Sequence, residues 1–276
     1  MVSSAVLFHY TLSRHILSDR KLLRLLPRLI RELQRDLFVP WNKRLQKELA
    51  EPLFIADLHL RVFVITLEAS EARFVDLRSS LQVQEIVYDT VLAVNGMLEF
   101  NKSDLHEFAG KKRISMLTHN SGDLFNMRSI VHEKFRFGCF LTHINLWKEL
   151  HSSEAKYRVI LEDDVSISPT FDARVLTSLN SLPASWDLLY LGSTAPNYGG
   201  RFSESIYQLR GALGTFGYII SQAGASKMLE AAKHSDKPVD HVLDSAMYTG
   251  RVSAFHVVPS IVKHRDDLES TLAYVH

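Results

Sequence analysis

Strand-like apolar runs alternate with helical patterns from residue 58 onward. The runs that are rich in β-branched and aromatic residues, as buried strands are, lie at 60–67, 157–161, 186–192 and 216–221. Apolar residues at helical spacing lie at 70–81, 138–150 and 223–234. Strands that alternate with helices are typical of an α/β domain with a mostly parallel sheet. The sequence therefore predicts such a domain over residues 58–276.

The segments between these runs are less regular. A further strand is expected near 85–93, ending in a turn at Asn95-Gly96, and 253–262 is expected to be extended. Residues 101–134 are polar without a clear period, which predicts irregular chain that includes flexible loop.

Residues 1–57 differ from the rest in charge. Residues 1–50 contain ten Lys and Arg against four acids, and leucines recur there at helical spacing around Pro27. This pattern predicts a basic helical N-terminal extension that is kinked or divided at the proline. Two roles stay open: peripheral contact with an anionic membrane through residues 11–50, or a helix packed on the main domain with a solvated basic face.

Charge and cysteine content limit the function classes. The formal net charge of +1 over 276 residues gives no reason to expect nucleic acid as a partner. A single cysteine, Cys139, rules out an intramolecular disulfide and favours a reducing compartment. The longest apolar stretches fall short of the roughly 18 residues that span a bilayer. We expect a cytoplasmic protein, either free or peripheral at the inner face of the membrane.

Three consecutive acids, Glu162-Asp163-Asp164, follow the apolar run 157–161 directly. They could begin a helix, where acids suit the dipole, or form a solvated turn. They could also form a metal site, since ligands of α/β sheets bind at the carboxyl ends of strands. A divalent cation would offset the repulsion between the three charges, and carboxylate oxygens suit Mn²⁺ or Mg²⁺.

Several stretches in a fixed order carry a resemblance to a known family. They are "VFVITLEASEAR" (62–73), "LAVNG" (92–96), "GCFLTHINLW" (138–147), "VILEDDV" (159–165), "WDLLYLG" (186–192), "GTFGYIIS" (214–221), "PVDHVLD" (238–244) and "VVPSIVKH" (257–264). In this order the chain resembles glycosyltransferase family 25, which includes lipopolysaccharide and procollagen galactosyltransferases. Asn95, Met97, Arg136 and Thr142 depart from the family's usual Asp, Arg, Glu and Ser.

The resemblance implies a GT-A-type nucleotide-binding domain with helices around the sheet, a UDP-sugar as donor and Mn²⁺ (or Mg²⁺) as cofactor. It assigns Asp164 as the direct metal ligand. Glu162 and Asp163 would contact the ribose or base or reach the metal, with Glu162 counted among the ligands. His264 would be a second ligand or an ordinary loop histidine. Strand alternation predicts Glu162 and Asp164 on one side and Asp163 on the other.

Donor contacts are expected from the first strand and the turn that follows the second. The residues expected to border the uridine are Thr66, Leu67, Glu68 and Arg73. Asn95-Gly96 would let the backbone approach the nucleotide closely. His143 would contact the donor or its pyrophosphate, or be a buried structural group, and Trp147 is expected in the core.

The implied reaction inverts the anomeric centre, so it needs a general base near the acceptor hydroxyl. Asp240 is the expected base, and it would also suit a helix N-cap. Asp244 is the competing carboxylate.

The resemblance thus implies transfer of a hexose, galactose in the first instance, from a UDP-sugar to a glycan or glycolipid acceptor such as lipooligosaccharide. Another nucleotide-sugar or a protein acceptor is the nearest alternative. A metal-dependent phosphoesterase and a non-catalytic carbohydrate-binding protein are alternatives of other classes.

Overall fold

The computed structural model describes residues 61–67, 71–97, 101–118 and 124–268. The predicted extension 1–57 and the predicted nucleotide contact Glu68 lie outside these ranges. Within them, no helix is both long enough and apolar enough to cross a membrane.

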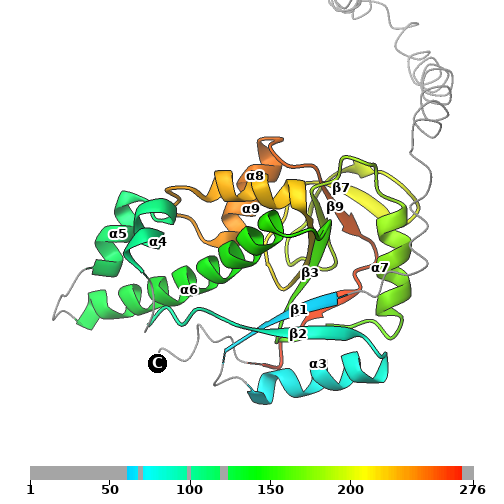
Figure 1. The fold of residues 1–276 in the computed structure, drawn as a ribbon, viewed down its shortest axis with the longest axis horizontal. Helices are drawn as coiled ribbons and strands as arrows, with labels where there is room; N and C mark the ends of the chain where they lie inside the picture. Colours follow the sequence, from blue (N-terminus) through cyan, green and yellow to red (C-terminus); the bar gives the residue numbers. More distant parts are fainter. Residues whose placement is uncertain (1–60, 68–70, 98–100, 119–123, 269–276) are drawn as a thin grey trace, which may run out of the picture. The chain divides into compact units, whose positions relative to one another are not determined.

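A central sheet of eight strands organises the described chain (Figure 1). Its order is β2-β1-β3-β8-β5-β9-β7-β6. The strands are β1 (Arg61–Thr66), β2 (Val87–Leu92), β3 (Tyr157–Glu162), β5 (Leu188–Tyr190), β6 (Asn197–Arg201), β7 (Ile206–Gly211), β8 (Gly217–Ser221) and β9 (Ala254–Val257). β8 and β7 run against the other strands, so the sheet is mixed although most strands share one direction.

A second, two-stranded sheet pairs β4 (Val165–Ile167) antiparallel with β10 (Val262–His264). β4 follows β3 after only two residues, and β10 lies near the end of the described chain. The register sets His264 opposite Val165. This pairing brings a residue from the end of the chain beside the acids that follow β3.

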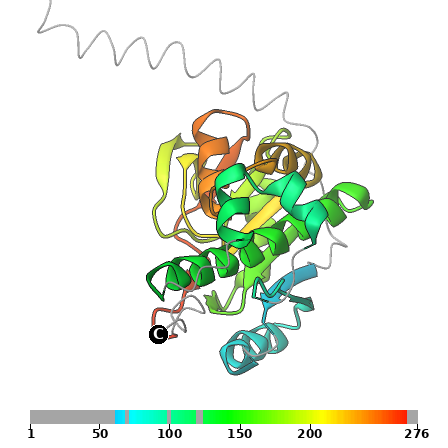
Figure 2. The ribbon, with the colours of Figure 1, turned by 90° about the vertical axis from the view of Figure 1, so that its left-hand side faces the viewer.

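Helices cover both faces of the central sheet. They are α3 (Glu71–Val83), α4 (Lys102–Phe108), α5 (Lys111–Thr118), α6 (Leu124–Ser152), α7 (Phe171–Asn180), α8 (Gln222–Ala232) and α9 (Val239–Tyr248). α6, α8 and α9 gather on one side, with α4 and α5 beside α6 (Figures 1 and 2). The α/β class predicted from the sequence is confirmed.

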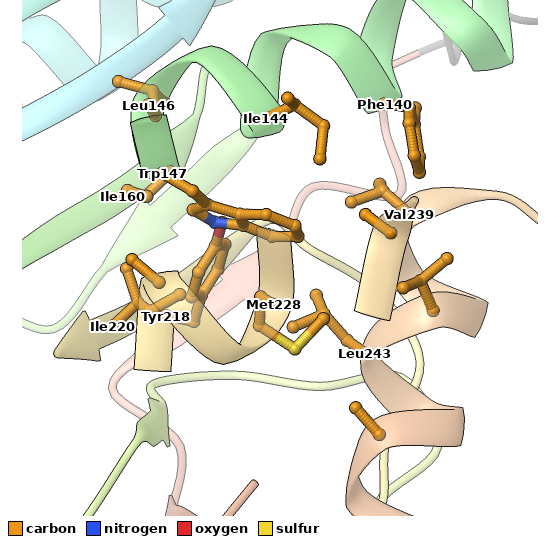
Figure 3. Close-up of a cluster of buried hydrophobic side chains, with 14 of the residues drawn as sticks. Phe140, Ile144, Leu146, Trp147, Ile160, Tyr218, Ile220, Met228, Val239 and Leu243 are labelled. Atoms are coloured by element: carbon orange, nitrogen blue, oxygen red, sulfur yellow. The ribbon is translucent and has the colours of Figure 1, made fainter. Parts of the chain in front are cut away.

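Successive side chains along each strand point to opposite faces of the sheet, so they contribute to two separate hydrophobic cores. Ile160 of β3 belongs to the core under α6, α8 and α9, whereas its neighbours Val159 and Leu161 belong to the core with α3 and α7. In the first core, Trp147 packs among Ile160, Tyr218 and Met228 (Figure 3). Trp147 is fully buried, which confirms its predicted place in the core.

The prediction of irregular chain over 101–134 is wrong for its described part, which forms α4, α5 and the start of α6. Asn101 caps α4 by accepting a hydrogen bond of 2.7 Å from the Ser103 backbone N–H. Arg113 is buried and pairs with Glu133 at 2.7 Å. Polar residues that cap the helices or form ion pairs between them interrupt the helical spacing of apolar residues, so the sequence shows no clear period here.

Candidate active site

The acids Glu162, Asp163 and Asp164 lie where β3, β1 and β10 come together. β3 ends at Glu162, and a two-residue turn holds both aspartates. The Arg265 backbone N–H donates to the Asp164 carbonyl at 2.9 Å, fixing the chain after β10 to this turn. The main-chain frame of the site therefore comes from strands that lie far apart in the sequence.

Arg73 of α3 supplies a positive charge to both aspartates. Its guanidinium forms an ion pair with Asp164 and lies 3.3 Å from Oδ1 of Asp163. The Arg73 side chain is only 11% exposed, so this pairing takes place in a largely desolvated setting. The expected alternation of the acids is wrong beyond Glu162, because the strand has ended and both aspartates turn to Arg73.

Asp163 and Asp164 differ in their other partners. Thr66 donates a hydrogen bond of 2.7 Å to Oδ2 of Asp163. His264 Nε2 lies 3.4 Å from Oδ2 of Asp164. Oδ1 of Asp164 is buried and has no hydrogen-bond partner in the structure. A buried carboxylate oxygen without a partner is costly unless a ligand completes it.

Burial sets the electrostatics of this turn. Desolvation raises the pKa of Asp163, and the Thr66 hydroxyl and Arg73 oppose that rise. Desolvation and then the negative charge of Glu162 raise the pKa of Asp164. Ionisable groups with shifted pKa values that gather at strand ends are typical of functional sites.

Glu162 faces a different set of groups. The Thr215 hydroxyl donates to its Oε1 at 2.7 Å, and His143 Nε2 lies 3.6 Å from the same oxygen. Burial opposes its charge, but the interactions with His143, Thr215 and His264 together lower its pKa. Glu162 is thus held as a carboxylate beside two aspartates whose charge is disfavoured.

The residues present fit a hard divalent cation at Asp164. The unpartnered Oδ1 of Asp164 offers a buried carboxylate ligand, and His264 Nε2 lies 3.4 Å from the other oxygen of the same carboxylate. The full predicted ligand set of Asp164, Glu162 and His264 is not gathered as closely as Cys139, His143 and Glu162, whose ligand atoms all lie within 4.8 Å of one another. The sequence did not single out Cys139 for this neighbourhood.

The predicted nucleotide contacts divide into two groups. Thr66 and Arg73 hold Asp163 and Asp164, and Leu67 follows Thr66 at the end of β1, half-buried. Asn95 and Gly96 lie in a turn that packs on α6, where a Cβ on Gly96 would overlap the Lys134 carbonyl oxygen. Close helix packing therefore accounts for the glycine.

His143 is fully buried on α6. Its Nδ1 lies 2.8 Å from the Tyr218 hydroxyl, which also accepts a hydrogen bond of 3.0 Å from Trp147 Nε1. These contacts fit the structural reading of this histidine, although its second ring nitrogen faces Glu162.

Asp240 lies in the first turn of α9 and is half-buried. Pro238, not Asp240, occupies the N-cap, and Asp240 Oδ1 accepts a hydrogen bond of 2.9 Å from the next backbone N–H. Desolvation of the sulfur, and then the charges of Glu162, Asp240 and Asp164, raise the pKa of the Cys139 thiol, although other atoms of this residue are exposed. Asp240 and the acids near the end of β3 are thus all close enough to Cys139 for their charges to affect its thiol. Asp244 lies one helical turn on, against Gly211.

Comparison with known proteins finds relatives whose names point to one family of glycosyltransferases. The chain is 31% identical over 192 residues to procollagen galactosyltransferase 1-B of Xenopus laevis, covering 66% of this chain and 30% of that protein. It is 28% identical over 196 residues to human procollagen galactosyltransferase 2, covering 66% and 29%. It is 31% identical over 195 residues to the probable inactive glycosyltransferase 25 family member 3 of Rattus norvegicus, covering 66% and 32%.

The chain thus spans about a third of the length of these curated relatives. The family model described as glycosyltransferase family 25 (LPS biosynthesis protein) matches residues 59–195. This range includes β1, α6 and the acids after β3, while Asp240 and His264 lie beyond it. The family model and the relatives together show that the chain belongs to glycosyltransferase family 25.

Proposed function

We propose that this chain transfers a hexose, galactose in the first instance, from a UDP-sugar to an acceptor hydroxyl with the help of Mn²⁺ or Mg²⁺. The observation that carries the proposal is the buried, unpartnered Asp164 oxygen beside Arg73 and His264. The galactosyltransferases among the relatives support the donor sugar. The reaction class, the metal and the donor can be tested together in one experiment.

In this proposal Asp164 is the direct cation ligand, with Glu162 and His264 completing the protein's share. A bound cation would stabilise the charge that builds on the departing diphosphate. Arg73 and Thr66 position the aspartates, and Arg73 adds positive charge where the phosphates would lie. The proposed contacts of the nucleotide are Thr66, Leu67, Glu68, Arg73, Asn95, Gly96 and Asp163. His143 is proposed to contact the donor or its pyrophosphate, with a structural role beside Glu162 as the alternative.

Asp240 is the proposed general base. Its carboxylate would accept the proton of the acceptor hydroxyl as the oxygen attacks the anomeric carbon from the face opposite the diphosphate. Half-burial and a position on the first turn of α9 suit this role, because the carboxylate is anchored yet open on one side. Asp244 is the alternative base.

The proposed acceptor is a hydroxyl of a glycan or glycolipid such as lipooligosaccharide. The words "LPS biosynthesis protein" in the family description support this choice. A protein hydroxyl is the alternative that the procollagen-related relatives support. We further propose a catalytic domain over 58–276 with a basic helical extension over 1–57, peripheral membrane contact through 11–50 and a cytoplasmic location.

A screen of UDP-sugars for Mn²⁺-dependent hydrolysis and then transfer tests the proposal. Asp164→Ala should lose metal-dependent donor binding, whereas Asp240→Asn should keep donor binding and lose transfer. Glu230→Gln, at an exposed position on α8, is the matched charge-loss control and should behave as wild type. Transfer at the wild-type rate in Asp240→Asn, with loss in Asp244→Asn, would move the base role to Asp244.

A second candidate is a non-catalytic member of the family, which the relative named as probably inactive favours. Calorimetry separates the two. An enzyme should bind UDP more tightly when Mn²⁺ is present, and a non-catalytic protein that has lost the donor site should show no metal-dependent nucleotide binding.

A further inference from the structure

Cys139, His143 and Trp147 follow one another at four-residue spacing on α6. This spacing places their side chains one above the other on the same helix face. His143 and Trp147 both contact the Tyr218 hydroxyl, so this face turns toward β8 and β3. Cys139 is the member nearest the start of the helix, and it reaches solvent.

Three ligand atoms converge at this face. The Cys139 Sγ, a His143 ring nitrogen and a Glu162 carboxylate oxygen all lie within 4.8 Å of one another. Helix α6 supplies two of these residues and the end of β3 supplies the third. A thiol, an imidazole and a carboxylate are the side chains that bind Zn²⁺ in proteins.

His143 gives an independent sign of a ligand. Its side chain is 1% exposed, and its Nε2 is buried without a hydrogen-bond partner. The nearest acceptor, Glu162 Oε1, lies 3.6 Å away, which is too long for a hydrogen bond. A buried ring nitrogen in this condition loses its hydration without compensation unless a further group binds between it and the carboxylate.

The surroundings of these groups are already ordered. The Tyr218 hydroxyl holds His143 Nδ1 at 2.8 Å, and Thr215 holds Glu162 at 2.7 Å. Partners on the far side of a ligating histidine and carboxylate fix their orientation and strengthen metal binding. With a cation on Nε2, Nδ1 would carry the hydrogen and donate it to Tyr218.

We propose that Cys139, His143 and Glu162 form a binding site for a thiophilic divalent cation such as Zn²⁺. Cys139 is the exposed member of the three, so an ion can reach the site from its side. Sulfur and nitrogen ligands favour Zn²⁺ over Mn²⁺ or Mg²⁺, so this site differs in chemistry from the oxygen-rich group around Asp164. It needs no sugar donor and stands independently of the proposed transferase reaction.

Glu162 belongs to both sites, which has a consequence for regulation. A Zn²⁺ ion that occupies Glu162 withdraws this carboxylate from the cation at Asp164. Zn²⁺ should therefore weaken Mn²⁺-dependent UDP binding, and Cys139→Ser should remove that inhibition. This consequence rests on the proposed function, whereas the site itself does not.

Titration of the full, untagged chain with Co²⁺ tests the site, since a cobalt–thiolate absorption band can come only from Cys139, the single cysteine of the sequence. We expect a band that saturates at one cobalt per chain and disappears when Zn²⁺ is added. Cys139→Ser should lose the band and weaken Zn²⁺ affinity at least tenfold, and His143→Gln should weaken it similarly.

His241→Gln, which removes an exposed histidine of α9, is the matched control and should leave Zn²⁺ affinity unchanged. Cys139→Ser changes one atom at an accessible position, so it keeps the test valid if His143→Gln unfolds.

A folded wild-type protein without a thiolate band would overturn the proposal. So would saturation at one cobalt per two chains, or equal Zn²⁺ affinity in Cys139→Ser and wild type. UDP binding with Mn²⁺ is measured separately, so failure here leaves the transferase proposal standing.

Discussion

At the residue scale, the positive charge of Arg73 explains how acidic side chains can lie together at the end of a buried strand. Two carboxylates packed at the end of a buried strand need a positive charge, and the guanidinium on α3 provides one within the fold itself. A divalent cation would add to this charge rather than replace it. Arg73 is therefore both a positioning residue and a structural counter-ion.

Arg73→Met should lower the free energy of unfolding by about 3–5 kcal/mol, because it leaves Asp163 and Asp164 buried without their partner. Urea unfolding measures the loss. Arg61→Met is the matched control: Arg61 pairs with Asp89 at an exposed position, where solvent screens the interaction, so its effect should be far smaller. Equal losses in the two variants would show that burial does not matter for the Arg73 pair.

His256 provides a pH-dependent prediction. Burial lowers its pKa to about 4, while an unfolded histidine titrates near 6.5. The folded state therefore excludes a proton that the unfolded state binds. This histidine's contribution is fully present above about pH 6.5 and is lost as the pH falls toward 4, by up to roughly 3 kcal/mol.

The comparison of wild type with His256→Gln isolates this effect. The unfolding free energy of wild type should fall more steeply between pH 6.5 and 4 than that of His256→Gln, because glutamine does not titrate. His241→Gln, at an exposed position, should follow wild type. Parallel curves for wild type and His256→Gln would contradict the burial argument.

The sequence predicted that the acids, Thr66 and His264 belong to one site, and in the structure each lies at or just after the end of a strand. It did not predict that Arg73 faces the aspartates, because a helix pattern gives the face of a residue but not the partner that tertiary packing brings to it. It also carried strand alternation past Glu162, where the backbone turns. In the sequence, Cys139 bears on disulfides, on the compartment and on the family resemblance. A single sequence does not show which residues of other elements lie beside it.

At the element scale, the turn after β2 and helix α6 depend on each other. A Cβ on Gly138 would overlap the Val94 carbonyl oxygen and lie 2.7 Å from the Gly96 backbone nitrogen. The Thr142 hydroxyl accepts a hydrogen bond of 2.9 Å from the Val94 N–H. Two glycines and one hydroxyl thus seat the turn on the helix that carries Cys139 and His143.

Gly138→Ala should destabilise the protein by about 1–3 kcal/mol, although alanine is the better helix former, because backbone atoms on the facing turn cannot yield cheaply. Thermal or urea unfolding measures it. Gly200→Ala is the matched control, since nothing lies within 4 Å of a Cβ built there. A stabilised Gly138→Ala protein would mean that the turn can move away from α6.

Elements with strong apolar patterns were predictable, and those with weak patterns were not. β1 and β8 are buried over most of their length and β3 at its centre, Val159 to Leu161, so their sequences contain apolar runs. β6 is largely exposed and contains two glycines, so it exists through pairing with β7 and not through its own sequence. The direction of β8, antiparallel to both neighbours, is likewise a property of the sheet as a whole.

At the scale of the whole molecule, the candidate site is assembled from segments that approach one another only in the folded state. Arg73 comes from α3, Asp164 from the turn after β3 and His264 from β10. A ligand that needs all three can bind only the native protein. Binding must then stabilise the fold by RT ln(1 + [L]/Kd), or about 2.7 kcal/mol at a hundredfold excess over Kd.

UDP with Mn²⁺ should therefore raise the melting temperature of the wild-type protein, and UDP with a chelator should raise it less or not at all. Asp164→Ala should lose the metal-dependent part of the shift, because it removes the proposed cation ligand. Glu230→Gln removes an exposed carboxylate and should keep the full shift. A metal-dependent shift of wild-type size in Asp164→Ala would place the cation elsewhere on the molecule. The buried, unpartnered oxygen of Asp164 would then need an explanation other than a bound cation.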